Sequence, residues 1–277
     1  MSVPYFYKNK NSKFISIEGE DSSEFLQNLI TNDIYKCKNN GVIYACLLTP
    51  QGKFICDFFI FKKDNKFILE THELFFKNLL KKLKIYKLRS DININEIKNY
   101  FSYVVFGNFN KDDQTVIFTP DPRKENIGYK LIQNEKNPQQ LKNFEEIEEN
   151  KYHEILIKNT IPLSHYDLEM NKSLLLENNF ENLNSISWDK GCYIGQEITA
   201  RMKYRALLKK RIYSLKIESG TPSTFQTIEE KENELGKIIS FKNKSILAMM
   251  KIDDAEKKIQ SNEPIKTNDG LILNFIT

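Results

Sequence analysis

The strongest constraint on the fold is a series of short apolar runs separated by turn residues. Residues 42–48 and 55–61 are rich in β-branched and aromatic side chains, and Thr-Pro-Gln-Gly-Lys at 49–53 joins them. Such runs with a Pro and a Gly between them predict two strands joined by a turn. Residues 67–70 predict a third strand. Residues 73–88 carry apolar side chains at helical spacing, which predicts a helix packed on these strands in an α+β layer.

The amino-terminal and middle segments add further elements. Residues 14–17 and 103–106 predict strands because both are short apolar runs. Asp21 followed by Glu24 resembles a capping box and predicts a helix directly after it. Residues 134–150 are polar and acidic, which predicts a solvated connection or the start of a helix.

The carboxyl-terminal part of the chain changes to strands. Phe-Lys-Asn-Lys-Ser at 241–245 predicts a hairpin turn between two of them. Residues 205–277 are therefore predicted to form a small β-barrel or sandwich. The predicted strands are 212–217, 235–241, 245–252 and 271–275.

Composition and charge exclude several classes of protein. The 277 residues include 40% hydrophobic and 28% charged side chains, which excludes a disordered or fibrous chain and suits two or three folded domains. A net charge of +4 is too small for a dedicated nucleic-acid-binding protein. Because no apolar run has the length of a signal peptide or a membrane span, we expect a cytoplasmic location and no membrane partner.

The residues that commonly bind metals show no metal-site spacing. The four cysteines contain no C-x-x-C pair, and the three histidines contain no H-x-x-x-H pair, so no metal site is expected. Neither a phosphate-binding P-loop motif nor G-x-G-x-x-G occurs, so nucleotide hydrolysis and Rossmann-type dinucleotide binding have no support.

The densest candidate site surrounds Cys192. Gly191 and Gly195 bracket this cysteine and permit a tight turn that exposes the thiol. A helix that starts nearby and the charge of Lys190 would both favour the thiolate, which is the reactive form. The polar pair Gln196 and Glu197 favours a site, whereas a lone cysteine is otherwise most often a small buried residue.

A basic stretch follows this segment. Six Lys or Arg side chains and no acidic one lie between Thr199 and Arg211, including three of the five arginines in the chain. Arginine suits planar recognition of carboxylate or phosphate, so an anionic ligand, an RNA backbone and a solvated helix face all remain open. Asp57 lies inside an apolar strand, where a ligand contact and an edge-strand surface position are both open.

The segment 190–197, Lys-Gly-Cys-Tyr-Ile-Gly-Gln-Glu, with Ala200-Arg201 and Lys210-Arg211, resembles the K-G-C-Y-x-G-Q-E…A-R…K-R signature of the YgfZ family. That family consists of folate-binding proteins related to the T-protein, the aminomethyltransferase of the glycine cleavage system. The resemblance extends to Thr31-Asn32-Asp33, to the turn at 49–53 and to Asn-Ser-Ile-Ser at 184–187.

The resemblance implies an α+β fold of three domains in a ring around a central cavity, with a small β-barrel at the carboxyl terminus. The implied folate-binding domain is discontinuous and spans 1–45 plus 100–200. Residues 46–99 would form a ferredoxin-like α+β domain, and 205–277 the barrel.

The resemblance also implies a function. Members bind folate and support assembly or repair of iron–sulfur clusters in a subset of enzymes, which indirectly affects tRNA modification. Tetrahydrofolate or another reduced folate is the implied cofactor. Iron–sulfur client or assembly proteins are the implied partners, with tRNA-modifying enzymes as further ones and no direct binding of nucleic acid.

The same resemblance assigns roles to individual residues. Cys192 would be the functional thiol and Lys190 its electrostatic neighbour. Arg201 would meet the acidic tail of folate, and Tyr152 would stack on the folate. The remaining implied folate-site residues are Asp57, Tyr193, Gln196 and Glu197.

Three departures bear on the reaction. Ile157-Lys158-Asn159-Thr160 replaces the L-E-A-G of the T-protein, whose Glu contacts the pterin, and Cys56-Asp57 replaces two adjacent aspartates. Ala206 stands where relatives often carry Gly. Aminomethyl transfer needs a carboxylate near the folate nitrogen, so the lost carboxylates argue against it. These losses and Ala206 also weaken the implied pterin contacts. A folate-dependent one-carbon transferase remains the alternative, and whether the protein is an enzyme stays open.

Overall fold

The computed structural model describes residues 3–112, 115–205 and 208–276, so Ala206 lies outside the described residues. The chain forms two compact units. Unit 1 comprises Met1–Glu148, Met170–Lys172 and Glu181–Gln196, and unit 2 comprises Glu149–Glu169, Ser173–Phe180 and Glu197–Thr277. The predicted three-domain boundaries stay a prediction.

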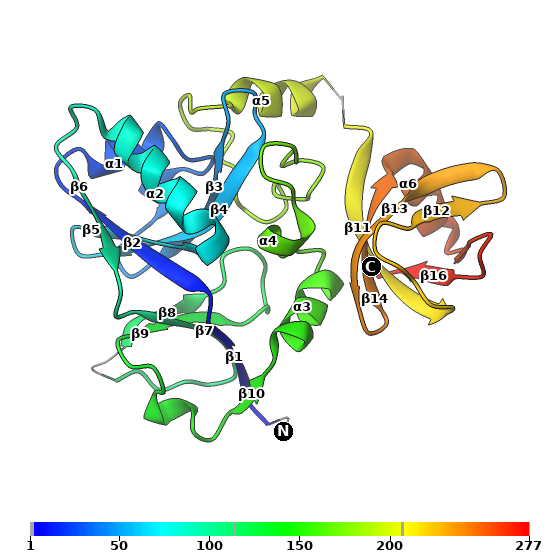
Figure 1. Ribbon diagram of the computed structural model, residues 1–277, viewed down its shortest axis with the longest axis horizontal. Coiled ribbons are helices and arrows are strands. Elements are labelled where there is room, and N and C mark those ends of the chain that lie inside the picture. The colour runs from blue at the N-terminus through cyan, green and yellow to red at the C-terminus, as the bar shows by residue number, and fades with distance from the viewer. Residues whose placement is uncertain (1–2, 113–114, 206–207, 277) are drawn as a thin grey trace. The chain divides into compact units, whose positions relative to one another are not determined.

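The first sheet of unit 1 has the strand order β3-β4-β5-β2-β6, with antiparallel neighbours throughout (Figure 1). The predicted hairpin, the third strand and the strand at 14–17 are confirmed within it. The bounds are β2 Ser12–Glu18, β3 Val42–Leu48, β4 Phe54–Lys63, β5 Lys66–His72 and β6 Asn93–Ile97.

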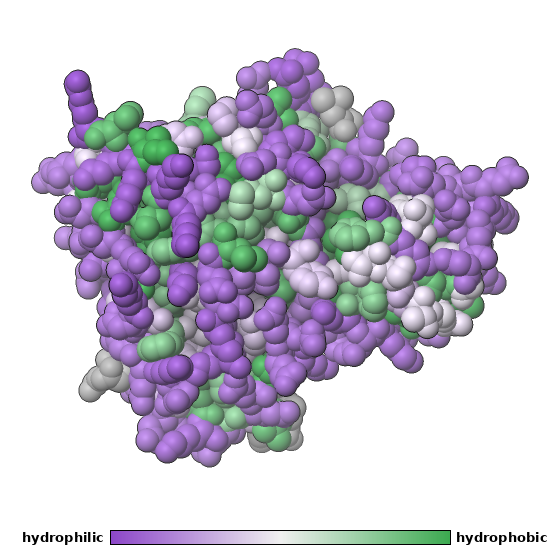
Figure 2. Space-filling view, in the orientation of Figure 1, coloured by the Kyte–Doolittle hydropathy of each residue, from purple (hydrophilic) through white to green (hydrophobic). Residues whose placement is uncertain are grey.

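The predicted helix at 73–88 is confirmed as α2 (Glu73–Lys87), which packs on β2, β4 and β5. Its buried side chains are Phe75, Phe76, Leu79 and Leu83. Its outer face carries lysines and two exposed aliphatic residues, Leu74 and Ile85, and the exposed Leu88 follows directly after the helix. Figure 2 accordingly shows apolar surface interspersed with polar surface over α1 and α2.

The second sheet of unit 1 has the order β10-β1-β7-β9-β8, in which β10 is parallel to β1 and the other pairs are antiparallel. The predicted strand at 103–106 is confirmed as part of β7. The two sheets share a core of Phe14, Phe61, Ile68, Val116, Ile117 and Ile132. The bounds are β1 Tyr5–Asn9, β7 Phe101–Phe106, β8 Thr115–Pro120, β9 Tyr129–Gln133 and β10 Glu145–Ile147.

The chain passes between the two sheets twice at one place. β1 pairs with β7 in the second sheet, and β2 pairs with β6 in the first. The β1–β2 turn and the β6–β7 loop therefore make the same crossing side by side. A short helix, η2 (Gln139–Leu141), lies between β9 and β10.

The predicted helix after Asp21 is confirmed as α1 (Ser22–Gln27), but the predicted capping box is wrong. The Asp21 side chain caps no helical N–H. Its Oδ2 instead accepts a hydrogen bond from the Asp91 backbone N–H at 2.7 Å. A partner distant in sequence has replaced the local one. η1 (Ile34–Lys36) follows α1.

Unit 2 contains the predicted carboxyl-terminal barrel, a six-stranded sheet of order β12-β13-β14-β11-β16-β15. The two outer strands are linked through Asn268, whose N–H donates to the Glu229 carbonyl at 3.0 Å and whose side chain bonds to the Lys231 backbone. These bonds nearly close the barrel. The bounds are β11 Lys210–Ser219, β12 Thr227–Glu230, β13 Asn233–Lys242, β14 Ser245–Lys251, β15 Ile265–Lys266 and β16 Ile272–Phe275.

Four helices occur in the described part of unit 2. α3 (Glu149–Lys158) packs on β13 and β14 through Ile157, which meets Ile212 and Leu247 in a small apolar core. A buried pair of His153 Nε2 and Asp167 Oδ2 at 3.3 Å joins α3 to α4 (Ser164–Asp167). α5 spans Gln196–Tyr204 and α6 spans Ile252–Ser261. None of the described helices is both long and apolar enough to cross a membrane.

Candidate functional site

Cys192 presents the accessible thiol of this protein. All four cysteines are described, and of these only Cys192 is exposed. Burial raises the pKa of Cys37 to about 11 and raises the pKa values of Cys46 and Cys56 well above the usual range. These three side chains are therefore neutral thiols shielded from solvent, and Cys192 is the cysteine that solvent can reach.

The loop that carries Cys192 is docked at one of its two glycines. Gly195 has φ +83°, and a Cβ there would lie 2.4 Å from the carbonyl oxygen of Thr49 in the β3–β4 turn. At Gly191 a Cβ would have no atom within 4 Å. The predicted tight turn therefore requires glycine at Gly195, whereas Gly191 leaves open space beside Cys192.

Lys190 anchors the same loop to the end of α1 and to the segment that follows it. Its ammonium donates hydrogen bonds to the backbone carbonyls of Gln27 at 2.6 Å, Ile30 at 2.8 Å and Asn32 at 2.8 Å. Burial lowers the pKa of Lys190 to about 8, although Asp33 raises it. The contacts that the structure gives this side chain are structural, and its predicted role beside the Cys192 thiol stays a prediction.

Two motifs of the sequence signature meet next to this anchor. The Thr31 hydroxyl donates to the Ser185 carbonyl at 2.7 Å. The Asn32 amide donates to the carbonyls of Asn184 at 2.7 Å and Tyr44 at 2.9 Å. The Thr-Asn-Asp and Asn-Ser-Ile-Ser segments therefore form one hydrogen-bonded support for the thiol loop.

Tyr193 adds a polar atom that the protein itself leaves unused. Its side chain is buried, with the ring 5.1 Å from the Lys190 ammonium. The hydroxyl is buried and has no hydrogen-bond partner among the described residues. Burial and the neighbouring Cys46 raise the pKa of Tyr193, so the phenol is neutral and can donate a proton to an acceptor.

Asp57 is half-buried on β4 and accepts a hydrogen bond from the Tyr44 hydroxyl at 2.5 Å. Burial and Asp57 together raise the pKa of Tyr44 well above its usual value, which keeps that hydroxyl a donor. Because β3 and β5 flank β4, the alternative of an edge-strand surface position for Asp57 is wrong.

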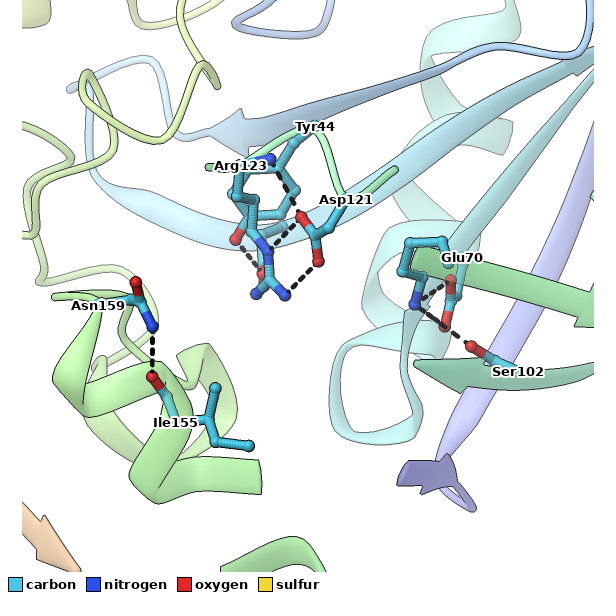
Figure 3. Close-up of polar contacts among 9 residues, drawn as sticks. Tyr44, Glu70, Ser102, Asp121, Arg123, Ile155 and Asn159 are labelled. Atoms are coloured by element: carbon cyan, nitrogen blue, oxygen red, sulfur yellow. Dashed lines mark hydrogen bonds and ion pairs between the residues drawn. The ribbon is translucent and has the colours of Figure 1, made fainter. Parts of the chain in front are cut away.

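Two buried ion pairs in unit 1 were not anticipated from the sequence. Arg123 contacts Asp121 through two hydrogen bonds at 2.7 and 3.0 Å, and its guanidinium lies 5.0 Å from the Phe59 ring. Lys130 pairs with Glu70 at 2.8 Å and lies 4.4 Å from the same ring. Figure 3 shows Arg123 with Asp121 near Tyr44, and separately Glu70 with Ser102. Arg123 is one of only five arginines in the chain, and this rarity was the sequence signal that could have drawn attention to it.

The remaining predicted site residues divide between the units. Gln196 belongs to unit 1, and its N–H donates to the Tyr193 carbonyl at 3.2 Å. Tyr152, Glu197 and Arg201 belong to unit 2. Tyr152 is buried on α3, while Arg201 and Glu197 form a 2.5 Å ion pair on α5 with side chains 45% and 78% exposed. Within unit 1 the structure brings Lys190 and Tyr193 together. The roles of all these residues stay predictions.

The departure at 157–160 has a clear structural setting. Lys158 points to Glu154 on its own helix, at 2.6 Å. α3 then ends with the N–H of Ile161 on the Leu156 carbonyl and that of Thr160 on the Ile157 carbonyl. This is a Schellman motif, which places Thr160 at φ +57° in the position that glycine favours.

A metal-binding cluster of three or more His, Cys, Asp or Glu side chains does not occur in the described parts of the chain.

The comparisons with known proteins identify the fold. Residues 9–107 match the GCVT N-terminal domain family, and residues 209–270 match the CAF17 C-terminal β-barrel domain family. The solved structure of the glycine cleavage system aminomethyltransferase T from Bartonella henselae is similar to this chain with a TM-score of 0.74 and 10% identity, over 99% of this chain and 85% of that one. The chain has the aminomethyltransferase T fold. The predicted fold class with its carboxyl-terminal barrel is thereby confirmed.

Similar sequences are named iron–sulfur cluster assembly factors. The IBA57 homologue of Neurospora crassa is 30% identical over 228 residues, which cover 74% of this chain and 52% of that protein. IBA57 of Mus musculus is 25% identical and IBA57 of Homo sapiens 23% identical, each over 76% of this chain and 65% of the relative. The chain thus spans between about half and two thirds of the length of these relatives.

The expectation of a cytoplasmic location is wrong. These relatives are named as mitochondrial proteins. The expectation rested only on the lack of an apolar targeting or membrane segment, and the lack of such a segment does not identify a compartment. The predicted link to iron–sulfur cluster assembly is confirmed at the level of the relatives' names.

Proposed function

We propose that this protein is an assembly factor for iron–sulfur clusters and that it works through the Cys192 thiol. We also propose that it acts in mitochondria, because its relatives are named as mitochondrial proteins. The observation that carries the proposal is the exposure of Cys192 while the other three thiols are buried. An accessible thiolate can bind iron, carry sulfur or exchange with a disulfide. The proposed partners are iron–sulfur client or assembly proteins, and effects on tRNA modification would follow through cluster-dependent enzymes.

Tetrahydrofolate is the proposed cofactor, and the side chains present suit it in part. Tyr193 offers a buried hydroxyl without a partner among the described residues, and Asp57 offers a half-buried carboxylate. Arg201 of unit 2 is the proposed contact for an acidic tail, and that tail would have to displace Glu197, with which Arg201 is paired. When bound, the folate would supply a carrier for a one-carbon unit. Lys158 removes one pterin contact of the T-protein, so the pterin would depend on Asp57 and Tyr193.

Thiol labelling and complementation test the role of Cys192. In the native protein a maleimide should react with one cysteine, and Cys192→Ser should abolish that reaction. In cells that lack the endogenous protein, Cys192→Ser should fail to restore cluster-dependent enzymes. Cys37→Ser is the matched control, because the Cys37 thiol lies 3.3 Å from the Ile60 carbonyl, where a hydroxyl also fits. Full complementation by Cys192→Ser would remove this thiol from the mechanism.

Calorimetric titration with tetrahydrofolate tests the cofactor. Wild type should bind, Tyr193→Phe should bind more weakly because it lacks the hydroxyl, and Arg201→Ala should weaken the contribution of the acidic tail. Arg205→Ala is the matched control, since it removes an exposed arginine just beyond α5. Equal affinity for all four proteins would contradict these ligand contacts, and no binding would contradict the cofactor itself.

A one-carbon transferase is the second candidate, favoured by the aminomethyltransferase T fold. It predicts that incubation with tetrahydrofolate and an aminomethylated carrier protein yields methylene-tetrahydrofolate, ammonia and the free carrier. Against it, Lys158 is paired with Glu154 where the T-protein has a carboxylate, and Cys56 replaces one of two aspartates. We therefore expect no such product, and its formation would reverse the order of the two candidates.

A further inference from the structure

A second concave site lies in unit 1, at the place where the chain passes twice between the two sheets. It has a volume of about 440 Å³ and is lined by the β1–β2 turn, the β6–β7 loop and a residue after β9. Asn9 and Ser102, which are paired across β1 and β7, are part of the lining. The pocket carries five lysines: Lys8, Lys10, Lys13, Lys98 and Lys136.

We propose that this pocket binds a nucleotide, with its phosphates on the lysines and its base against the aromatic residues Tyr100 and Phe101. Nothing in the proposed iron–sulfur function requires the site, and none of the residues assigned to that function line it. The nucleotide proposal can therefore succeed or fail independently of the roles proposed for Cys192 and folate.

The charge of the pocket calls for an anion. Among the described residues that line it, none is acidic. Glu146 is 3.9 Å from Lys10, but the two side chains are 49% and 74% exposed, so water screens this pair strongly. Five ammonium groups around one concavity repel one another, and a polyanion removes that repulsion.

The Lys8 ammonium is held in place by hydrogen bonds and lies close to other positive charges of the pocket. Its ammonium donates to the Lys136 carbonyl and to the Asn137 side chain, each at 2.8 Å. Burial lowers the pKa of Lys8. Glu146 raises it, whereas Lys136 and Lys10 lower it further. A lysine held by neutral acceptors beside two other cations is preorganised for phosphate.

The size of the pocket and its two aromatic side chains favour a nucleotide over other polyanions. The volume falls within the range of about 300–1,000 Å³ that small-molecule sites occupy. Tyr100 and Phe101 are half-buried, and the Tyr100 ring packs edge-on against Phe14 at 5.7 Å, which holds its orientation. A base can stack on such a ring. A single concavity also suits one nucleotide better than an RNA strand, which needs a groove along several nucleotides.

Calorimetry with ATP, inorganic tripolyphosphate and adenosine tests the proposal. ATP should bind, tripolyphosphate should bind several-fold more weakly, and adenosine should bind least. Affinity for ATP should fall as salt rises, because screening weakens the lysine–phosphate attraction. Lys13→Gln/Lys98→Gln should weaken ATP binding about tenfold or more, since each charged hydrogen bond to phosphate contributes strongly. Both lysines are exposed, so the fold should persist.

Lys77→Gln/Lys81→Gln is the matched control, with the same change in charge on the exposed face of α2 outside the pocket. It should leave ATP affinity unchanged. If both double variants weakened ATP binding equally, the effect would reflect the net charge of the protein and not this pocket, which would overturn the proposal. Lack of ATP binding at millimolar concentration, or equal affinity for ATP and tripolyphosphate, would do the same. Tighter binding of a single-stranded RNA than of ATP, with the same sensitivity to Lys13→Gln/Lys98→Gln, would make the surface an RNA site instead.

Discussion

Replacing Lys190 by methionine tests whether this residue is a structural anchor or a partner of the thiol. The substitution keeps the length of the side chain and removes the donors that bind the carbonyls of Gln27, Ile30 and Asn32. An unsatisfied buried acceptor costs about 2 kcal/mol, so three would cost roughly 6 kcal/mol. Burial of the ammonium, which lowers the pKa of Lys190 from 10.5 to about 8, costs the wild type roughly 3 kcal/mol and offsets part of this.

The net expectation is a loss of roughly 3 kcal/mol in the free energy of unfolding. Urea titration followed by tryptophan fluorescence measures it, because the single tryptophan, Trp188, lies in the same loop. Lys36→Met is the control, since the exposed Lys36 makes one hydrogen bond to Ser187 at 3.0 Å and should cost under about 1 kcal/mol. A variant Lys190→Met that unfolds like wild type but whose Cys192 reacts more slowly with maleimide would refute the anchor and support the thiol partner.

Three further predictions rest on single contacts. Gly195→Ala should strongly lower the midpoint of urea unfolding, because its Cβ would lie 2.4 Å from the Thr49 carbonyl at positive φ. Gly191→Ala should leave the midpoint unchanged, because no atom lies within 4 Å of its Cβ position. Similar midpoints for the two variants would contradict the docked loop. Thr160→Gly should raise thermal stability by about 1 kcal/mol, because glycine relieves the φ of +57° at the end of α3, and a loss of stability in calorimetry would contradict that reasoning. Burial raises the pKa of Glu154, but hydrogen bonds from Lys158, Asn243 and Lys151 outweigh it and lower the pKa to about 2 from 4.5. Since the folded pKa is the lower one, the stabilisation is full above about pH 4.5 and disappears as the pH falls towards 2. Because Lys151 and Lys158 are about half exposed, solvent screening reduces the effect of this shift on stability. Denaturant titrations should therefore find Glu154→Gln about 1 kcal/mol less stable than wild type at pH 7 and equal to it near pH 2, and a gap independent of pH would exclude the carboxylate as the cause.

The strands with strong apolar runs were predictable from the sequence. Residues 42–48 match β3 at both ends, and the helix predicted at 73–88 ends one residue earlier, at Lys87. In these elements the side chains that enter the core follow the period of the backbone, so local sequence contains the signal. The barrel was recognisable for the same reason.

Elements held by backbone pairing at the margins of a sheet were not predictable. β6 is the polar sequence Asn-Ile-Asn-Glu-Ile. β10 is Glu-Glu-Ile within the segment 134–150, which was expected to be a solvated connection or the start of a helix, and α3 does begin at its end. Each pairs at the edge of its sheet, where ladder hydrogen bonds form without an apolar face. α6 was missed because only Ala255 of its ten residues is buried.

The sequence singled out candidate residues, whose roles stay predictions, but it did not reveal the contacts that these residues make. The two glycines around Cys192 look equivalent in the sequence, yet only Gly195 has a neighbour that excludes a side chain. The sequence separation of Lys190 from its three carbonyl partners hides its role as an anchor. The pairing of Asp57 with Tyr44 depends on strand register, which the apolar run alone does not specify.

The hydrogen bonds between the amino-terminal segment and the thiol loop have a consequence for synthesis on the ribosome. Thr31 bonds to a residue 154 positions later, and Lys190 to one 163 positions earlier. At about 5–20 residues per second, the nascent chain waits roughly 10 to 30 s before the second segment exists. During that interval the carbonyls after α1 face water, and unit 1 lacks part of its support. A chain cut after Glu148 would remain in that unfinished state, so mutations in the thiol loop are expected to affect yield as well as activity.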